Sequence, residues 1–321
     1  MSHFLTDAQL EQFHEEGYLI VEDLFGEEDL TPVESEYAGV LDRLTDELYD
    51  EGQISSRYQD LPFGERLTKV YGESGKVHAQ YFDFSLPKSN VKADTPMWVG
   101  PQVFHMMRNE KLLDVVESVI GSEIYSNPIQ HVRLKPPERL TPKKADGRVQ
   151  LGKTAVHQDL GVALPEADDT KMLTVWFSFN DTSIKNGCLR VWPHSHRRGL
   201  MHHCNTRGGL GVPGQLLEGK SIAAEMKRGS VLFMDKLTLH ASHANNSDKI
   251  RFSFDLRYNP TGQRTGRPAF PGFVARSRQH PESEMRDPAD WSQLWHDART
   301  HLSTIEMDPF DRWDDTSPLC A

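Results

Sequence analysis

The strongest constraint on the fold of this 321-residue chain is a series of short strand-like runs from residue 123 onward. They lie at about 123–135, 153–159, 172–180, 187–192, 222–225, 230–235 and 250–258. Segments rich in Gly, Pro, Asn and Asp separate them. Many short strands with such turn residues between them are typical of a sandwich or a barrel. We therefore expect a mainly β core.

The residues before this region are expected to be largely helical. Thr6 can cap a helix and Gln9 can complete a capping box with it, while Gly17 can end that helix. A short strand at 18–21 should follow, because Tyr-Leu-Ile-Val favours extended backbone. The chain therefore begins with a helix and a strand.

Three further segments carry apolar residues at helical spacing. They are 31–50, the stretch from 101 to 120, which we expect to form two short helices, and 288–302. Residues 51–96 are rich in Gly, Ser, Pro and charge, so we expect a long irregular excursion beside a substrate entrance.

The sequence contains no repeat and no convincing linker, which favours one domain over residues 1–321. Its expected parts are a helical N-terminal support at about 1–122, a core at about 123–258 and a C-terminal extension at 259–321. The extension matches no motif that assigns it a role.

The charge balance limits the classes of partner. A formal net charge of −11 argues against nucleic acid, which usually requires a basic face. It also disfavours a substrate as anionic as a nucleotide thioester, unless local basic patches override it. No run is apolar enough to span a bilayer, so we expect no membrane partner.

The three cysteines, Cys188, Cys204 and Cys320, are an odd number at scattered spacing. This pattern argues against a disulfide framework and suits a reducing compartment. We therefore expect a cytoplasmic protein.

His157 and Asp159 are the first candidate metal ligands. Side chains two residues apart on a strand point to the same side, so this imidazole and carboxylate could reach one point in space. Two imidazoles and one carboxylate with open positions opposite form the facial triad of iron(II) oxygenases. Because His-x-Asp alone is a weak signal, the assignment needs a second histidine.

His240 is the candidate for that second histidine, since it follows a Gly-Ser turn and an apolar strand at 229–233. The alternative is that His240 or His243 lies in a surface loop. A strand that begins eleven residues later, at Arg251, favours the metal site.

The strand at 250–258 has one polar and one apolar face. Its polar side chains alternate along the strand, at Arg251, Ser253, Asp255 and Arg257. Such a strand is typical of a wall between a wet cavity and a core. We expect a turn at 245–248 and hairpin pairing to bring Arg251 into the cavity of His240. There a guanidinium could bind the distal carboxylate of 2-oxoglutarate through two parallel hydrogen bonds.

Several other residues are expected to be structural. His202 and His203 are adjacent, so their side chains point apart, and Pro193 interrupts the strand before His194 and His196. The tryptophans of the segment 288–302 have helical spacing and should pack. Arg257 stays open between a substrate clamp and a partner in the neighbourhood of Asp255.

Taken together, these motifs resemble the phytanoyl-CoA dioxygenase family of 2-oxoglutarate oxygenases. The matching stretches are Leu-Lys-Pro-Pro at 134–137, Val-His-Gln-Asp-Leu at 156–160, Asn-Gly-Cys-Leu-Arg-Val-Trp-Pro at 186–193, and Leu-His-Ala-Ser at 239–242 followed by Arg251. They occur in the order of the family and at roughly its spacing, which makes the set specific.

The resemblance implies a double-stranded β-helix, a jelly-roll or cupin-like core, with flanking N-terminal and C-terminal helices. His157, Asp159 and His240 would hold Fe(II). The residues that would contact 2-oxoglutarate are Arg251, Ser242, Trp176 and His131. Candidate substrate contacts are Arg133, Lys135 and Arg257.

The implied activity is oxidation of a C–H bond in a small organic metabolite, with 2-oxoglutarate and O2 as cosubstrates and release of succinate and CO2. Ascorbate could sustain it. Hydroxylation is favoured over halogenation because Asp159 fills the position that halogenating relatives leave to chloride, while desaturation, epoxidation and ring formation stay open. The expected partner is a small molecule, and a small or secondary metabolite is favoured over a fatty acyl thioester. A homodimer is left open.

The sequence departs from the family pattern in two places. His194 replaces a glycine before Ser-His, and a polar insertion with Lys143, Lys144 and Arg148 separates Lys135 from His157. We expect this insertion to form a mobile loop at the cavity mouth. Two other classes stay open, a catalytically silent metal and 2-oxoglutarate-binding module and a non-oxidative metal-dependent hydrolase or isomerase.

Overall fold

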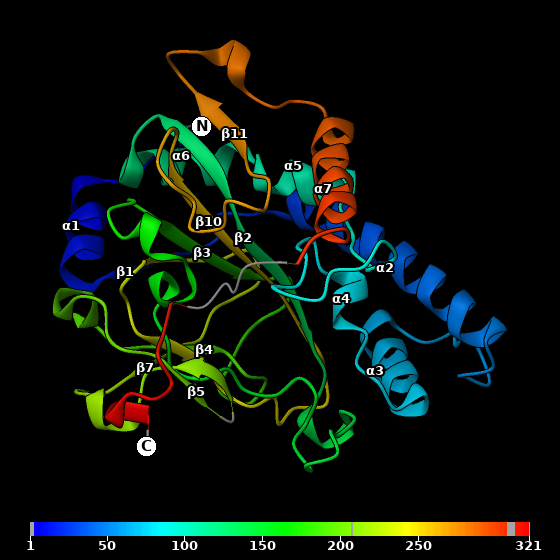
Figure 1. Cartoon of the computed structure of the whole chain (residues 1–321). Coiled ribbons are helices and arrows are strands. Elements are labelled where there is room, and N and C mark those ends of the chain that lie inside the picture. The colour runs from blue at the N-terminus through cyan, green and yellow to red at the C-terminus, as the bar shows by residue number, and fades with distance from the viewer. Residues whose placement is uncertain (1–2, 207, 307–311, 321) are drawn as a thin grey trace.

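A computed structural model describes residues 3–206, 208–306 and 312–320 (Figure 1). Its centre is a six-stranded antiparallel sheet with the order β1-β8-β3-β10-β2-β11. These strands are β1 (Tyr18–Val21), β8 (Val231–Asp235), β3 (Leu173–Ser178), β10 (Arg251–Pro260), β2 (Glu123–Lys135) and β11 (Phe273–Ser277). The long central pair, β10 and β2, crosses the middle of the molecule.

A smaller antiparallel sheet packs against the inner face of the large one. It has the order β7-β4-β9, formed by β7 (Ile222–Ala224), β4 (Leu189–Val191) and β9 (His240–Ser242). Trp176, Leu232 and Met234 of the large sheet pack against Leu189 and Val191 of the small one. Two facing antiparallel sheets give the expected jelly-roll arrangement, left open rather than closed into a barrel.

Helices cover the outer face of the large sheet. They are α1 (Asp7–Glu16), α2 (Glu27–Asp50), α3 (Phe63–Ser74), α4 (Ala79–Phe82), α5 (Pro101–Met107), α6 (Glu110–Ile120) and α7 (Pro288–Leu302). Figure 1 shows α2, α3, α4, α5 and α7 gathered on one side of β2. No helix in the described part of the chain is long and apolar enough to cross a membrane.

The alternation of apolar and polar residues expected for β10 gives the large sheet one face toward the apolar core and one toward the cavity. Phe252, Phe254 and Leu256 lie in the core beneath the helices, where Tyr37 of α2 packs edge-on against Phe252. The polar residues between them face the other way, toward the small sheet. The sheet thus separates an apolar core from a polar cavity, as the sequence predicted.

The structure confirms most of the predicted helix boundaries. Thr6 and Gln9 form the capping box of α1, and Gly17 ends that helix with φ of 80°. The helix at 288–302 and the two helices between 101 and 120 are present, and Trp291 and Trp295 are fully buried in packing. α2 begins earlier than predicted, at Glu27, because the side chain of Asp29 accepts a hydrogen bond from the backbone of Gly26.

The expectation of an irregular excursion over 51–96 is wrong for its middle part, which forms α3 and α4. Leu67, Val70 and Tyr71 recur at helical spacing and are fully buried. Arg66 donates hydrogen bonds to Asp42 and Thr45 of α2. The composition of the segment concealed this apolar stripe, which a test for periodicity would have found.

The predicted strand at 153–159 is also wrong. In this stretch only His157 forms a β-bridge, with His240, and a 3-10 helix begins at Asp159. The predicted hairpin between the strands of His240 and Arg251 is not formed either, since β9 belongs to the small sheet and β10 to the large one. The side chain of Asn245 binds the carbonyls of Lys135 and Lys249 where the chain crosses between the sheets.

Cys204 and Cys320 form a disulfide, which corrects the expectation drawn from the cysteine spacing. The bond joins η7 (Pro318–Cys320) to β5 (Cys204–Thr206), which pairs with β6 (Gly209–Gly211). Sequence could not predict the pair because its members lie 116 residues apart. Cys188 is the free cysteine of the described residues, and it is buried.

The C-terminal tail also packs behind the segment that follows His157. The indole Nε1 of Trp313 donates to the carbonyl of Gly161 at 2.7 Å, and its ring stacks on His203 with centroids 5.0 Å apart. Arg312 pairs with Asp168 at 2.8 Å. The disulfide therefore anchors the same tail whose Trp313 packs against the candidate metal-binding segment.

Reduction of the Cys204–Cys320 bond should lower the free energy of unfolding by about 2–5 kcal/mol, because the bond restricts a long loop in the unfolded chain. Urea denaturation with and without a thiol reductant measures this difference. Cys320→Ser should lose the same stability and should no longer respond to reductant. An unchanged wild-type midpoint under reduction would contradict the prediction.

Candidate active site

Three side chains from two separate segments meet between the two sheets. His157 Nε2 lies 3.8 Å and His240 Nε2 lies 3.9 Å from Oδ1 of Asp159. The donor atoms of the three residues all lie within 4.8 Å of one another. Two imidazoles and one carboxylate at this separation can act as three ligands to one divalent ion.

Backbone contacts fix the orientation of both imidazoles. Nδ1 of His157 lies 2.9 Å from the carbonyl of Ala155, and Nδ1 of His240 lies 3.0 Å from the carbonyl of Thr238. A carbonyl only accepts, so each Nδ1 carries the proton and each Nε2 has a free lone pair. Burial, together with the nearby His240, lowers the pKa of His157 to about 3, which keeps this imidazole neutral.

Asp159 is fully enclosed and has protein partners on both oxygens. Arg257 donates to Oδ1 and Thr174 donates to Oδ2. Burial alone would raise the pKa of Asp159, but the Arg257 guanidinium and the two histidines hold it below its usual range. The carboxylate is therefore ionised and oriented by the protein itself.

Arg257 thus contacts Asp255, one of the two roles that sequence left open, and also Asp159, which sequence did not suggest. It pairs mainly with Asp159, lies 3.4 Å from Asp255, and donates to the carbonyl of Ile129 at 2.9 Å. Its guanidinium also lines the cavity. The sequence did not reveal the contact with Asp159, because the two residues are 98 positions apart.

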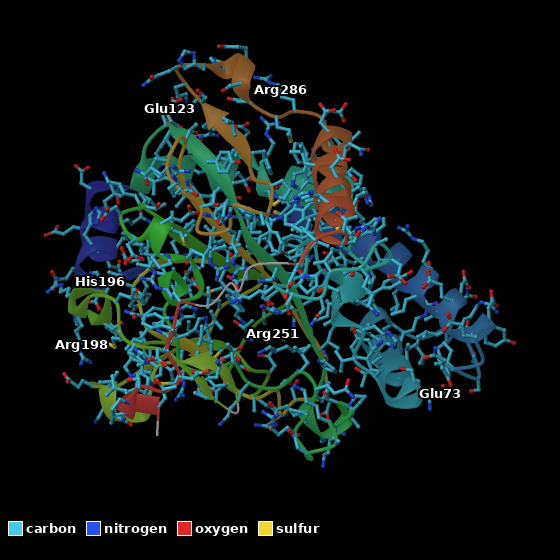
Figure 2. All side chains as sticks on the ribbon, viewed as in Figure 1. Glu73, Glu123, His196, Arg198, Arg251 and Arg286 are labelled. Carbon is cyan, nitrogen blue, oxygen red and sulfur yellow. A yellow bond between two sulfur atoms is a disulfide. The ribbon has the colours of Figure 1, made fainter. Side chains whose placement is uncertain are left out.

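Arg251 lies in the interior of the same cavity, which has a volume of about 250 Å³. Figure 2 labels it near the centre of the molecule, whereas Glu73 and Arg286 lie at the edge. Its guanidinium donates to the carbonyl of Gly187 and lies 5.4 Å from the ring of Trp176. Burial and the neighbouring Arg133 lower the pKa of Arg251 to about 10, so it stays charged at neutral pH.

Ser242 and Lys135 lie next to each other. Lys135 Nζ donates to Ser242 Oγ at 2.9 Å and to Thr154 Oγ1 at 3.1 Å. In the register of the large sheet Lys135 is opposite Arg251. Lys135 therefore lies beside two of the predicted 2-oxoglutarate residues, Ser242 and Arg251. Burial, with Arg251, lowers the pKa of Lys135 well below its usual value.

His131 and Trp176 both line the cavity, on the two strands that flank β10. Nδ1 of His131 lies 2.8 Å from Oδ2 of Asp83. Burial lowers the pKa of His131. Three of the predicted cosubstrate residues, Arg251, Trp176 and His131, thus lie on the large sheet, whereas Ser242 lies on β9 of the small sheet.

The cavity also has walls that sequence analysis did not single out residue by residue. Lys88 comes from the 51–96 segment, Arg267 from the C-terminal extension, Gly208 from the end of the turn before β6, and Gly209 and Leu210 from β6 itself. No local motif marks these residues, because only the folded chain brings them together. The insertion with Lys143, Lys144 and Arg148 supplies no side chain to the described lining. Lys143 pairs with Val149 across its own turn.

The histidines expected to be structural have structural contacts. His194 and His196 lie 2.9 and 3.1 Å from backbone carbonyls at the end of α1. His203 accepts a hydrogen bond from the backbone of Gln158, between the two candidate ligands His157 and Asp159. It therefore supports the metal-binding segment from behind.

Solved structures share this fold. A non-haem monooxygenase named ThoJ has a TM-score of 0.58 at 15% identity, covering 92% of this chain and 99% of ThoJ. The epimerase SnoN, in complex with Fe3+, alpha ketoglutarate and nogalamycin RO, has a TM-score of 0.51 at 16% identity, covering 81% of this chain and 86% of SnoN. At these sequence identities the likeness shows the fold alone, and it confirms the predicted fold class.

Sequence relatives point to one family. A phytanoyl-CoA dioxygenase domain-containing protein 1 homolog of Dictyostelium discoideum is 23% identical over 274 residues, which are 79% of this chain and 91% of that protein. The phytanoyl-CoA dioxygenase of Arabidopsis thaliana is 24% identical over 259 residues, covering 78% and 88%. The family model for phytanoyl-CoA dioxygenase matches residues 13–253. The chain therefore belongs to the phytanoyl-CoA dioxygenase family of non-haem iron, 2-oxoglutarate-dependent dioxygenases.

Proposed function

We propose that this dioxygenase oxidises a C–H bond of a small organic molecule in the cavity between its two sheets, with His157, Asp159 and His240 as the iron ligands. The observation that carries the proposal is the meeting of these three side chains at one point, in a cavity that Arg251 also lines. The cofactors are those of the family, Fe(II), 2-oxoglutarate and O2.

The donor set fits an iron(II) centre. Both imidazoles present Nε2, and the carboxylate is ionised, so the three residues would bind a divalent ion without first losing a proton. Bound iron would supply the oxidising power, with 2-oxoglutarate converted to succinate and CO2. The protein would hold the ligands, orient the substrate and limit access of water.

Arg251 is the proposed partner of the distal carboxylate of 2-oxoglutarate. Its guanidinium is buried against Trp176, and no carboxylate among the described residues pairs with it. An anion would offset this buried charge, and a planar guanidinium suits a carboxylate. We assign supporting roles to Ser242, Lys135 and His131, which lie beside it.

Two alternatives explain less of the site. A metal-dependent hydrolase or isomerase could use the same three ligands, but it would have no need for a buried arginine that faces an anion site. A silent binding module would bind metal and 2-oxoglutarate without forming succinate. Production of succinate in the presence of Fe(II), ascorbate and O2 separates both from the proposed enzyme.

Asp159→Ala should abolish succinate formation. Loss of partners behind a metal ligand typically weakens metal affinity about 10–100-fold, so loss of the ligand itself should cost at least about 100-fold. Anaerobic calorimetric titration with Fe(II) measures this loss directly, and succinate release measures turnover. Asp60→Ala, at an exposed position, is the matched control and should retain both. Retention of wild-type metal affinity by Asp159→Ala would remove this residue from the ligand set.

Arg251→Gln should raise the KM for 2-oxoglutarate by about 10–100-fold, the range expected when a charge-assisted hydrogen-bonded pair is lost. Arg251→Lys should recover part of this loss, because it keeps the charge but not the paired N–H groups. The measurement is succinate formation against 2-oxoglutarate concentration, with metal affinity as the second readout. If Arg251→Gln left the KM unchanged, the assignment of the cosubstrate site would be wrong.

A further inference from the structure

The cavity is basic, although the chain as a whole carries a net charge of −11. Among the residues that the structure describes, the charged ones in its lining are the cations Lys88, Arg133, Arg251, Arg257 and Arg267 and the carboxylate Asp255. A cavity lined by charge of one sign concentrates ligands of the opposite sign. The local charge therefore differs in sign from the average of the sequence, and it favours anionic ligands.

Most of these cations have contacts that account for them. Arg257 pairs with Asp159 and Asp255, and Arg267 donates to the carbonyl of Val162 at 2.9 Å. Arg251 is the residue assigned above to 2-oxoglutarate. The cosubstrate does not require a further arginine in the lining.

Arg133 is the lining arginine whose charge none of these contacts or roles explains. It is half-buried on β2, and within residues 3–206, 208–306 and 312–320 it forms no hydrogen bond or ion pair. Two other basic side chains, Arg251 and Lys135, are close enough to feel its charge. Burial lowers the pKa of each of them most, and the positive charge of Arg133 lowers it further. A guanidinium in such surroundings gains more from an anionic ligand than one in water would.

A second polar group without a partner lies beside it. In the register of the large sheet Arg133 is opposite Ser253, and alternation along β10 turns Ser253 to the same side as the lining residues Arg251 and Asp255. The hydroxyl of Ser253 is buried and has no hydrogen-bond partner among the described residues. Because buried hydroxyls are usually satisfied, the unpartnered hydroxyl of Ser253 next to the half-buried guanidinium of Arg133 favours a ligand that accepts hydrogen bonds.

We propose that the substrate carries a carboxylate and that Arg133, with Ser253 beside it, is the group that recognises this carboxylate. The proposal rests on the proposed function, whose substrate class it names. The cavity of about 250 Å³ must also hold 2-oxoglutarate, so the part of the substrate that lies inside it with the carboxylate is small. Arg133 is then a specificity-determining residue of the site.

The position of Arg133 agrees with a role distinct from that of Arg251. The two residues lie on different strands, and Arg133 is one alternation step closer to His131 along β2 than Lys135, the partner of Arg251. The substrate carboxylate would therefore lie beside the cosubstrate and on the same wall. Lys88, from the segment after α4, adds positive charge on this lining.

Matched acids and amides test the proposal without knowledge of the natural substrate. The probes are 3-phenylpropionate, hexanoate and cyclohexanecarboxylate, each compared with its neutral amide. Protein loaded with Mn(II) and 2-oxoglutarate is titrated at constant ionic strength, with the shift in melting temperature and the calorimetric Kd as readouts. We expect the acids to bind and stabilise the protein more than their amides. Equal or absent stabilisation by acids and amides would overturn the proposal.

Arg133→Gln should weaken binding of the acids by at least about tenfold, because a charge-assisted contact is lost, and should leave the weak binding of the amides as it is. Arg133→Lys should restore part of the acid binding. Arg139→Gln, an exposed arginine of the same segment, is the matched control and should behave as the wild type. Wild-type binding of the acids by Arg133→Gln would also overturn the proposal.

The KM for 2-oxoglutarate separates this proposal from the cosubstrate assignment. Arg133→Gln should change it by a far smaller factor than Arg251→Gln does. An equal rise in both variants would make Arg133 a cosubstrate residue and overturn its role in substrate recognition. Failure of the wild type to form succinate would instead contradict the proposed function, and the Mn(II) binding data would still report on the acid site.

Discussion

The buried ion pair between Asp159 and Arg257 is the interaction on which the rest of the site depends. Both side chains are almost completely enclosed, and Thr174 occupies the second oxygen of the carboxylate. Asp159 begins the segment after the His157 bridge, whereas Arg257 belongs to β10, so the pair fastens the ligand segment to the large sheet. Removal of one partner of such a pair leaves a buried charge and typically costs about 3–5 kcal/mol. The ion pair that holds the candidate ligand Asp159 in place thus also contributes to the stability of the fold.

Local patterns in the sequence were sufficient to predict the structure where it depends on residues that are close together in the chain. The alternation of β10 predicted its cavity face and its core face, and Thr6 and Gln9 predicted the start of α1. They were insufficient where two distant segments must pair. His240 and Arg251 meet from opposite sheets and not through a hairpin, and Cys204 finds Cys320 across most of the C-terminal region. Such contacts arise from the global arrangement of strands, which a periodicity cannot encode.

The charge of the cavity illustrates the same limit in electrostatic terms. A net charge is a sum over the whole chain, and taken alone it disfavours a strongly anionic substrate. Alternation on β2 and β10 instead gathers Arg133, Arg251 and Arg257 on one side of the sheet, where solvent screens them poorly. The register of two strands therefore decides the sign of the potential that a ligand meets. Composition decides only the potential far from the cavity.

Several determinants of the site lie beyond the part of the chain that matches the family. The match ends at residue 253, whereas Arg257, Arg267 and Trp313 follow it. Trp313 binds the carbonyl of Gly161 and stacks on His203, whose imidazole lies so close to Gly161 that a Cβ there would meet it at 2.3 Å. The ligand segment is consequently enclosed between the large sheet and a tail that the family model does not cover. Because the tail and Arg267 both act on this segment or its cavity, differences among relatives in these C-terminal residues can alter the site while the three ligands stay the same.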